Sequence, residues 1–183
     1  MRSLPNMTVL APADGIEVEK MTRLIAGFKG PVYMRVNRND LPDLFPEEKP
    51  FEIGRPYVIR EGTDAVVFAH GVMVSKALEA ARVLEKKNLS IRVVNVSTLK
   101  PVDERRLCTL AADMKIVVTA EEHSLIGGLA DVVTYALRGG GTPIQSIGIN
   151  DCFGQSARNY EELLQHYGLT AENIYKTVKE NLK

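Results

Sequence analysis

Residues 117–129 read VVTAEEHSLIGGL, and this stretch decides the fold class. Residues 117–120 are mostly apolar and predict the end of a buried strand. Two carboxylates and a histidine follow, and the pair Gly127-Gly128 then leads into an apolar helical pattern. In an α/β sheet, such a strand-to-helix corner lies at the carboxyl edge, where binding sites usually form.

Short apolar runs alternate with amphipathic helical patterns on both sides of this corner. Buried strands are predicted at residues 65–69, 91–96, 116–120 and 144–149, and helices at 74–84, 103–111, 128–138, 160–167 and from 170 onward. Short apolar strands between amphipathic helices imply a mostly parallel sheet that is buried on both faces. We therefore predict an α/β three-layer sandwich, in which helices cover both faces of a mostly parallel five-stranded sheet.

The N-terminal part shows the same pattern but is too short to form a complete core. Strands are predicted at residues 7–11 and 32–36, and Asp14 can cap the helix between them. The apolar face of that helix consists of Met21, Leu24, Ile25 and Phe28. Two strands and one helix cannot cover both faces of a sheet. This incomplete strand-helix-strand piece is therefore expected to complete its core elsewhere.

Residues 42–56 interrupt the alternation of strands and helices. The prolines of this segment are Pro42, Pro46, Pro50 and Pro56. Such a composition predicts an extended linker rather than a packed element. We therefore divide the chain into the incomplete piece at residues 1–41, a linker at 42–56 and a complete α/β domain at 57–183.

Composition excludes several classes of function. Of the 183 residues, 45% are hydrophobic, and 23 Lys and Arg balance 23 Asp and Glu. The chain has no basic block, which argues against nucleic acid and against a charged membrane surface. It also has no apolar run near the roughly 20 residues that span a bilayer. Cys108 and Cys152 fit no metal or redox spacing, and we expect free, buried thiols in a cytoplasmic protein.

Glu121, Glu122 and His123 have two interpretations. Two carboxylates beside an imidazole could serve as acid and base groups or as metal ligands. Adjacent residues of a strand point in different directions, however, so the three side chains could not all converge on one ion without a tight turn. In the second interpretation, one carboxylate caps the helix after Gly127-Gly128 and His123 forms a local hydrogen bond.

The remaining candidates are equally open from chemistry alone. Gly127-Gly128 could admit an anion to backbone N–H groups, or could serve close packing or a subunit contact. Arg35 and Arg38 could bind a phosphate or carboxylate, or could pair with nearby aspartates. His70 follows a predicted strand and is more typical of a structural histidine.

Several segments together resemble one family. Residues 5–14 (PNMTVLAPAD) and 30–42 (GPVYMRVNRNDLP) resemble the end of the pyrimidine-binding domain of transketolases. Later segments resemble the transketolase C-terminal domain, namely IREG at 59–62, LKPVD at 99–103, EEHSLIGGL at 121–129, IGIND at 147–151 and FGQS at 153–156. The resemblance covers nearly the whole chain, and the order and spacing of the segments strengthen it.

The resemblance implies transfer of a two-carbon ketol unit between sugar phosphates, with thiamine diphosphate and Mg²⁺ at a dimer interface. The family's diphosphate- and metal-binding domain has no match in this sequence, and neither does the glutamate that activates the aminopyrimidine. The family pattern does match at Arg38, which corresponds to the arginine that contacts the substrate phosphate. The resemblance assigns no settled catalytic residue to the C-terminal domain.

The sequence is accordingly interpreted as the C-terminal portion or subunit of a transketolase that is inactive alone. We expect its partners to be an N-terminal cofactor-binding part and a second copy of the complete enzyme. Two enzymatic alternatives share this domain plan, namely the thiamine-dependent component of a 2-oxoacid dehydrogenase and deoxyxylulose-phosphate synthase. A third alternative is a non-catalytic α/β binding or assembly module.

Overall fold

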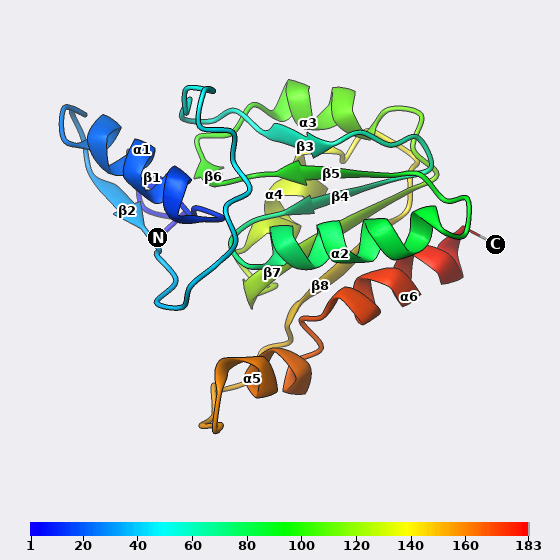
Figure 1. The fold of residues 1–183 in the computed structure, drawn as a ribbon. Helices are drawn as coiled ribbons and strands as arrows, with labels where there is room; N and C mark the ends of the chain where they lie inside the picture. The colour runs from blue at the N-terminus through cyan, green and yellow to red at the C-terminus, as the bar shows by residue number, and fades with distance from the viewer. Residues whose placement is uncertain (183) are drawn as a thin grey trace.

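The computed structural model describes residues 1–182, and its largest element is a five-stranded sheet (Figure 1). The strand order is β3-β5-β4-β7-β8. The strands are β3 (Tyr57–Arg60), β4 (Ala65–Ala69), β5 (Ile91–Asn95), β7 (Ile116–Ser124) and β8 (Ile144–Ile149). All neighbouring pairs are parallel except the edge strand β3, which runs antiparallel to β5.

Helices cover both faces of this sheet, as predicted. Helices α2 (Met73–Glu85) and α6 (Ala171–Asn181) pack on one face, and α3 (Glu104–Ala111) and α4 (Leu129–Ala136) on the other. Strand β4 is buried along its whole length and alternates between the two layers. Val67 joins the cluster with α2, whereas Val66 and Phe68 join the cluster with α3 and α4. The strand is therefore apolar throughout, as expected of a central parallel strand.

The register of the sheet places the ends of its strands in one line. Ala69 at the end of β4 pairs with Ala120 of β7 and with Asn95 of β5. His70 and Glu121 directly follow two of these paired residues. Parallel register alone therefore brings them to the same edge of the sheet.

The N-terminal part forms a second, smaller sheet. Strands β1 (Thr8–Leu10) and β2 (Val32–Met34) are parallel and are joined by helix α1 (Gly15–Ile25). The third strand, β6 (Thr98–Lys100), comes from the later part of the chain and pairs with β1 in antiparallel orientation. The incomplete piece thus completes its sheet with a strand from elsewhere.

The predicted elements of this part need two corrections. Strand β2 ends at Met34 rather than at residue 36. Phe28 lies beyond the end of α1 and is 39% exposed, so it is not part of the buried face of the helix. The predicted cap is confirmed, since Asp14 Oδ1 accepts a hydrogen bond from Glu17 N at 2.8 Å.

Residues 42–56 contain no helix or strand, but they are not the unpacked segment that the prolines indicated. Phe45 and Phe51 are buried, at 2% and 6% exposure. Phe45 meets Tyr57 edge to face, with ring centroids 4.9 Å apart. The second carboxylate oxygen of Asp14 accepts hydrogen bonds from Leu44 N and Phe45 N, both at 2.6 Å. The same aspartate therefore caps α1 and holds this segment against it.

A buried carboxyl group links the two parts of the chain. Glu17 is fully buried, and its two oxygens accept hydrogen bonds from Ser97 Oγ and Ala13 N, both at 2.7 Å. Ser97 immediately precedes β6. Burial raises the pKa of Glu17, although these hydrogen bonds oppose the shift.

Two further observations concern the expectations from composition. Cys108 and Cys152 are free, as expected, but both are exposed, so the expectation of buried thiols was wrong. Within residues 1–182, no helix is both long enough and apolar enough to cross a membrane.

We predict that Phe45→Ala destabilises the chain by about 3–5 kcal/mol, because it leaves a cavity where an aromatic ring is buried. The matched control is Phe153→Ala, since Phe153 is 99% exposed. That variant should change the free energy of unfolding by less than about 0.5 kcal/mol. Urea denaturation of both variants measures the difference. Equal stability of the two variants would show that the 42–56 segment does not pack as described.

Candidate functional site

The strand-to-helix corner begins later than the sequence indicated. Strand β7 continues through Ser124 instead of ending at Ala120. The chain then turns at Gly127, whose φ of +80° favours glycine, and enters α4 at Gly128. A Cβ atom at residue 128 would overlap the Glu121 carboxylate. The second glycine is therefore needed for close approach of the backbone to that side chain.

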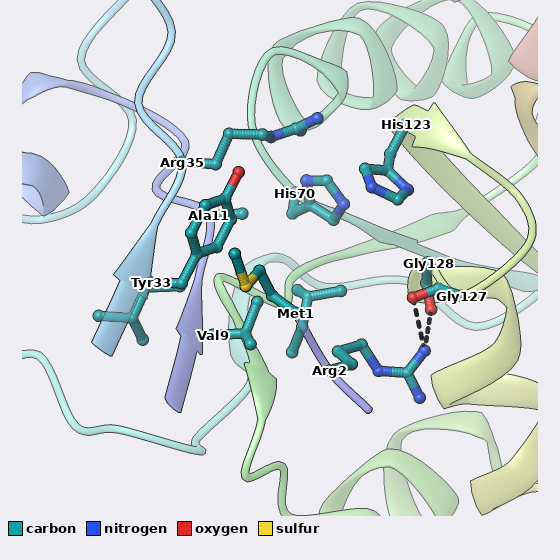
Figure 2. A pocket seen from close by; sticks show the side chains of 12 residues that line it. Met1, Arg2, Val9, Ala11, Tyr33, Arg35, His70, His123, Gly127 and Gly128 are labelled. Carbon is teal, nitrogen blue, oxygen red and sulfur yellow. Dashed lines mark hydrogen bonds between the residues drawn. The ribbon is translucent and has the colours of Figure 1, made fainter. Parts of the chain in front are cut away.

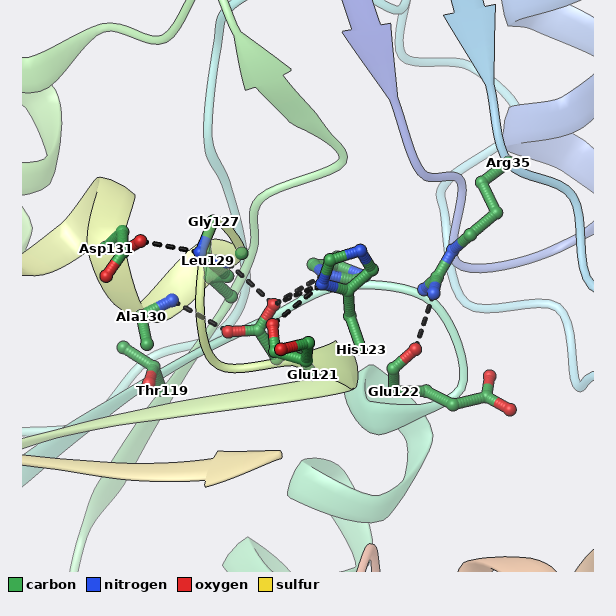
Figure 3. A network of polar contacts seen from close by, with 12 residues as sticks. Arg35, Thr119, Glu121, Glu122, His123, Gly127, Leu129, Ala130 and Asp131 are labelled. Carbon is green, nitrogen blue, oxygen red and sulfur yellow. Dashed lines mark hydrogen bonds and ion pairs between the residues drawn. The ribbon is translucent and has the colours of Figure 1, made fainter. Parts of the chain in front are cut away.

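Glu121 caps helix α4 (Figure 3). Its side chain is fully buried, and its two oxygens accept hydrogen bonds from Leu129 N at 2.7 Å and Ala130 N at 2.8 Å. A carboxylate at this position also interacts favourably with the positive end of the helix dipole. Gly127 N is occupied as well, because it donates to Asp131 Oδ2 at 2.6 Å. The geometry favours the capping interpretation over a site for an external anion at these N–H groups.

Two histidines lie near the capping carboxylate. His123 Nδ1 lies 2.7 Å from the carbonyl oxygen of Ser124 and 3.9 Å from Glu121 Oε2. His70 Nε2 lies 3.7 Å from the same carboxylate oxygen. His70 is 2% exposed, and burial is the main cause that lowers its pKa, against the opposing effect of Glu121. The local hydrogen bond of His123 matches the structural interpretation of this residue.

Glu122 points away from Glu121, as alternation along a strand requires. Its carboxylate oxygen Oε2 accepts a hydrogen bond from Asn37 Nδ2 at 3.2 Å, and its backbone carbonyl accepts one from the Arg35 guanidinium. The two adjacent carboxylates therefore serve different neighbours. Within residues 1–182, no group of three or more His, Cys, Asp or Glu side chains could hold a metal ion.

A small cavity of ≈ 210 Å³ lies between the corner and the N-terminal sheet (Figure 2). Arg35, His70 and His123 line its polar end, and Val9 and Leu99 contribute to its apolar walls. The lining also includes Gly127 and Gly128, whose carbonyl oxygens each accept a hydrogen bond from Arg2 Nη1 at 2.8 Å.

Arg38 lies apart from this corner, on a wider groove of ≈ 370 Å³. One wall is the segment after β2, and the other comes from the later part of the chain. The lining residues named by the sequence are Arg35, Arg38 and Glu122, and those that it did not single out include Asn37, Gly71, Tyr160 and Leu163. Arg38 is exposed and forms no hydrogen bond or ion pair with any other residue of the described chain. Its guanidinium is therefore available to an anion in the groove.

The structure thus separates the candidate residues into two sites. Glu121, His123, Gly127 and Gly128 form the corner, whereas Arg38 belongs to the groove. Glu122 connects them, because it lies on β7 beside Glu121 and contacts the segment that carries Arg38. Asn37 and Tyr160 were missed by sequence reasoning. Asn37 carries a signal only as the neighbour of Arg38, and the sequence around Tyr160 carries none.

Comparison with known proteins gives consistent matches. The sequence model of a family described as "Transketolase, C-terminal domain" matches residues 54–174. A "Putative transketolase C-terminal section" of Methanocaldococcus jannaschii is 39% identical, over 100% of this chain and 58% of that protein. One of the two subunits of an apulose-4-phosphate transketolase of Phocaeicola vulgatus is 34% identical, over 100% of this chain and 59% of that protein.

A solved structure matches the fold over the whole chain. It is titled "Split gene transketolase, inactive beta4 tetramer" and is 42% identical, with a TM-score of 0.93. The match covers 100% of this chain and 60% of that one. The chain thus spans less than two thirds of the length of the relatives that it matches.

Stability should fall below about pH 6.5, in part because of His70. A histidine with a lowered pKa in the folded state stabilises the fold above the pKa of the unfolded state, and loses that contribution as the pH falls. One such group adds at most about 1.4 kcal/mol per pH unit to the slope. His70→Gln should therefore reduce the slope of the unfolding free energy between pH 6.5 and 5, measured by urea denaturation.

The control is His166→Gln, because His166 is exposed on α5 (Tyr160–His166). That variant should keep the slope of the unmodified chain. A His70→Gln variant with the same slope as the unmodified chain would contradict the assignment of this pH dependence to His70.

Proposed function

We propose, from the premise that the chain belongs to the transketolase C-terminal domain family, that it is the C-terminal segment or subunit of a thiamine-diphosphate-dependent transketolase. The complete enzyme would move a two-carbon ketol unit between sugar phosphates. The observation that carries the proposal is the match of this whole chain to a split-gene transketolase structure, at a TM-score of 0.93. Two relatives, one named as a C-terminal section and the other as a transketolase subunit, support the same division of the enzyme.

The proposed partner is an N-terminal part that binds thiamine diphosphate and Mg²⁺. Residues 1–182 contain no cluster of side chains suited to hold that metal ion, so the chemistry of the cofactor would depend on the partner. Residues 1–41 would then be the end of a pyrimidine-binding domain, with the C-terminal domain at 57–183 after the 42–56 segment. The complete enzyme would be a homodimer. The Gly127-Gly128 corner is a candidate subunit contact, because the adjacent Ile126 is 68% exposed.

In this enzyme, Arg38 would contact the substrate phosphate. Its guanidinium is exposed on the groove and is not engaged by any other described residue. A guanidinium offers several N–H donors in a planar arrangement that matches phosphate oxygens. The groove also needs residues of the later domain to close its second wall. The proposed contribution of this chain is therefore assembly of the enzyme and recognition of the phosphate.

The isolated chain should not transfer ketol units, because the proposed cofactor-binding part lies on another polypeptide or segment. The solved relative is itself described as an inactive β4 tetramer. The experiment is a coupled ketol-transfer assay with thiamine diphosphate and Mg²⁺, on this chain alone and on the complex captured with it from its source cells. We expect turnover only with the complex.

Two results would contradict the proposal. Ketol transfer by the isolated chain would overturn the requirement for a partner. A captured complex that decarboxylates a 2-oxoacid without transferring ketol units would favour the dehydrogenase alternative, whereas a chain with no partner would favour the assembly module.

Arg38→Ala should raise the KM for phosphorylated substrates in the complex, with little change in cofactor affinity. A hydrogen bond to a charged group is worth about 1.5–3 kcal/mol, or roughly 10-fold to 150-fold in KM. The matched control is Arg105→Ala, which removes an exposed arginine on α3. If Arg38→Ala leaves the KM of the phosphorylated donor unchanged, Arg38 is not the phosphate contact.

A further inference from the structure

Tyr160 belongs to the later domain, yet it contacts the segment that carries Arg38. Tyr160 is the first residue of α5, and its hydroxyl oxygen accepts a hydrogen bond from Asn37 Nδ2 at 2.7 Å. The two residues are 123 positions apart in the sequence. The same Nδ2 donates to Glu122 Oε2 at 3.2 Å. The Asn37 amide nitrogen is thus held from two elements of the later domain, β7 and α5.

The opposite end of the Asn37 side chain shapes the backbone around Arg38. Asn37 Oδ1 accepts hydrogen bonds from Asn39 N at 2.8 Å and from Asn39 Nδ2 at 2.9 Å. A side-chain oxygen that accepts from the backbone N–H two residues later closes an Asx-turn. Arg38 is the central residue of that turn. Fixing the Asn37 side chain therefore fixes the backbone from which the Arg38 side chain extends.

The chemistry of Tyr160 suits this role. The residue is partly buried, and its ring packs against the core cluster of the large sheet. Burial and the neighbouring Glu122 carboxylate raise the pKa of the hydroxyl, so it stays protonated at neutral pH. A protonated hydroxyl can donate to the Glu122 carboxylate while its lone pair accepts from Asn37. Each member of the network therefore has a compatible partner.

We propose that Tyr160 is a positioning residue for Arg38, acting through the Asn37 side chain and the turn that it closes. This inference rests on the proposed role of Arg38 in phosphate recognition. It gives the C-terminal domain a specific part in substrate binding, beyond assembly. Tyr160 lines the same groove as Arg38 but is not itself assigned a contact with the substrate.

Tyr160→Phe tests this role, because it removes the hydroxyl and retains the ring. In the complex, we expect the KM for phosphorylated donors to rise about threefold to tenfold, the effect of one lost hydrogen bond. The kcat and the KM for a donor without a phosphate should change less than about twofold, because Arg38 would contact only the phosphate. In an Arg38→Ala background, Tyr160→Phe should raise the KM no further.

The matched control is Tyr167→Phe. Tyr167 lies at the other end of α5, and its hydroxyl donates to the carbonyl oxygen of Phe153 at 3.1 Å. This control removes a hydroxyl and one hydrogen bond without reaching Asn37. Asn37→Asp is a second informative variant, because it keeps the oxygen that closes the turn but loses the N–H donors. It should raise the KM at least as much as Tyr160→Phe, since a carboxylate would also face Glu122.

A second readout does not depend on catalysis. Hydrogen exchange at the Asn39 backbone amide, followed by NMR in the full chain, reports directly on the turn. Tyr160→Phe should accelerate this exchange about threefold to tenfold, whereas Tyr167→Phe should leave it unchanged.

The two readouts separate the possible failures. Unchanged exchange at Asn39 overturns the positioning role, whatever the KM does. Faster exchange with an unchanged KM overturns it as well, because the turn would then not matter to the substrate. A KM that rises equally for donors with and without a phosphate shows that Tyr160 does not act through Arg38. If Arg38→Ala itself leaves the KM unchanged, the proposed phosphate contact is wrong, and the positioning role fails with it.

Discussion

The geometry of both candidate sites depends on the Glu121 carboxylate that caps α4. A buried carboxylate is stable only when its oxygens are hydrogen-bonded, and the first N–H groups of a helix need acceptors. The contacts to Leu129 N and Ala130 N satisfy both needs at once. They also hold the end of β7 against the start of α4. Once Glu121 faces the helix, strand alternation turns Glu122 toward the N-terminal part, where it meets Arg35 and Asn37.

The N-terminal part is joined to the rest by polar contacts as well as by apolar packing. Strand β6 extends its sheet, Glu17 binds Ser97 next to that strand, and Asp14 holds the 42–45 backbone. Buried polar groups are costly unless they are paired, so these contacts disfavour other arrangements of the two parts. The groove with Arg38 needs this fixed arrangement, because its walls come from both parts. A division of function between the two parts would therefore still leave them mechanically coupled.

The sequence predicted the parallel strands well, because β4, β7 and β8 are apolar runs at regular spacing. It missed β3 and β6, which are short and mix polar with apolar residues, so neither the run nor the alternation is visible. It also ended β7 at Ala120, because a glutamate normally ends a buried strand. Glu121 can stay buried only because α4 supplies N–H groups, and that partner is known only from the three-dimensional structure. The prolines of residues 42–56 correctly indicated the absence of a helix or strand, but they could not reveal that Asp14 anchors Phe45.

The candidate site shows the same limit more sharply. Arg38 could be named from its sequence context, since its neighbours resemble a family motif. The residue that supports it could not, because Tyr160 lies on a different element and in no recognisable pattern. A side chain that binds a ligand is constrained by the chemistry of that ligand, which limits the residue types available. A side chain that fixes a turn from a distance is constrained only by geometry, and many residue types could serve if the backbone allowed it. The groove therefore combines one residue identifiable from chemistry with a support that depends on how the two parts pack together.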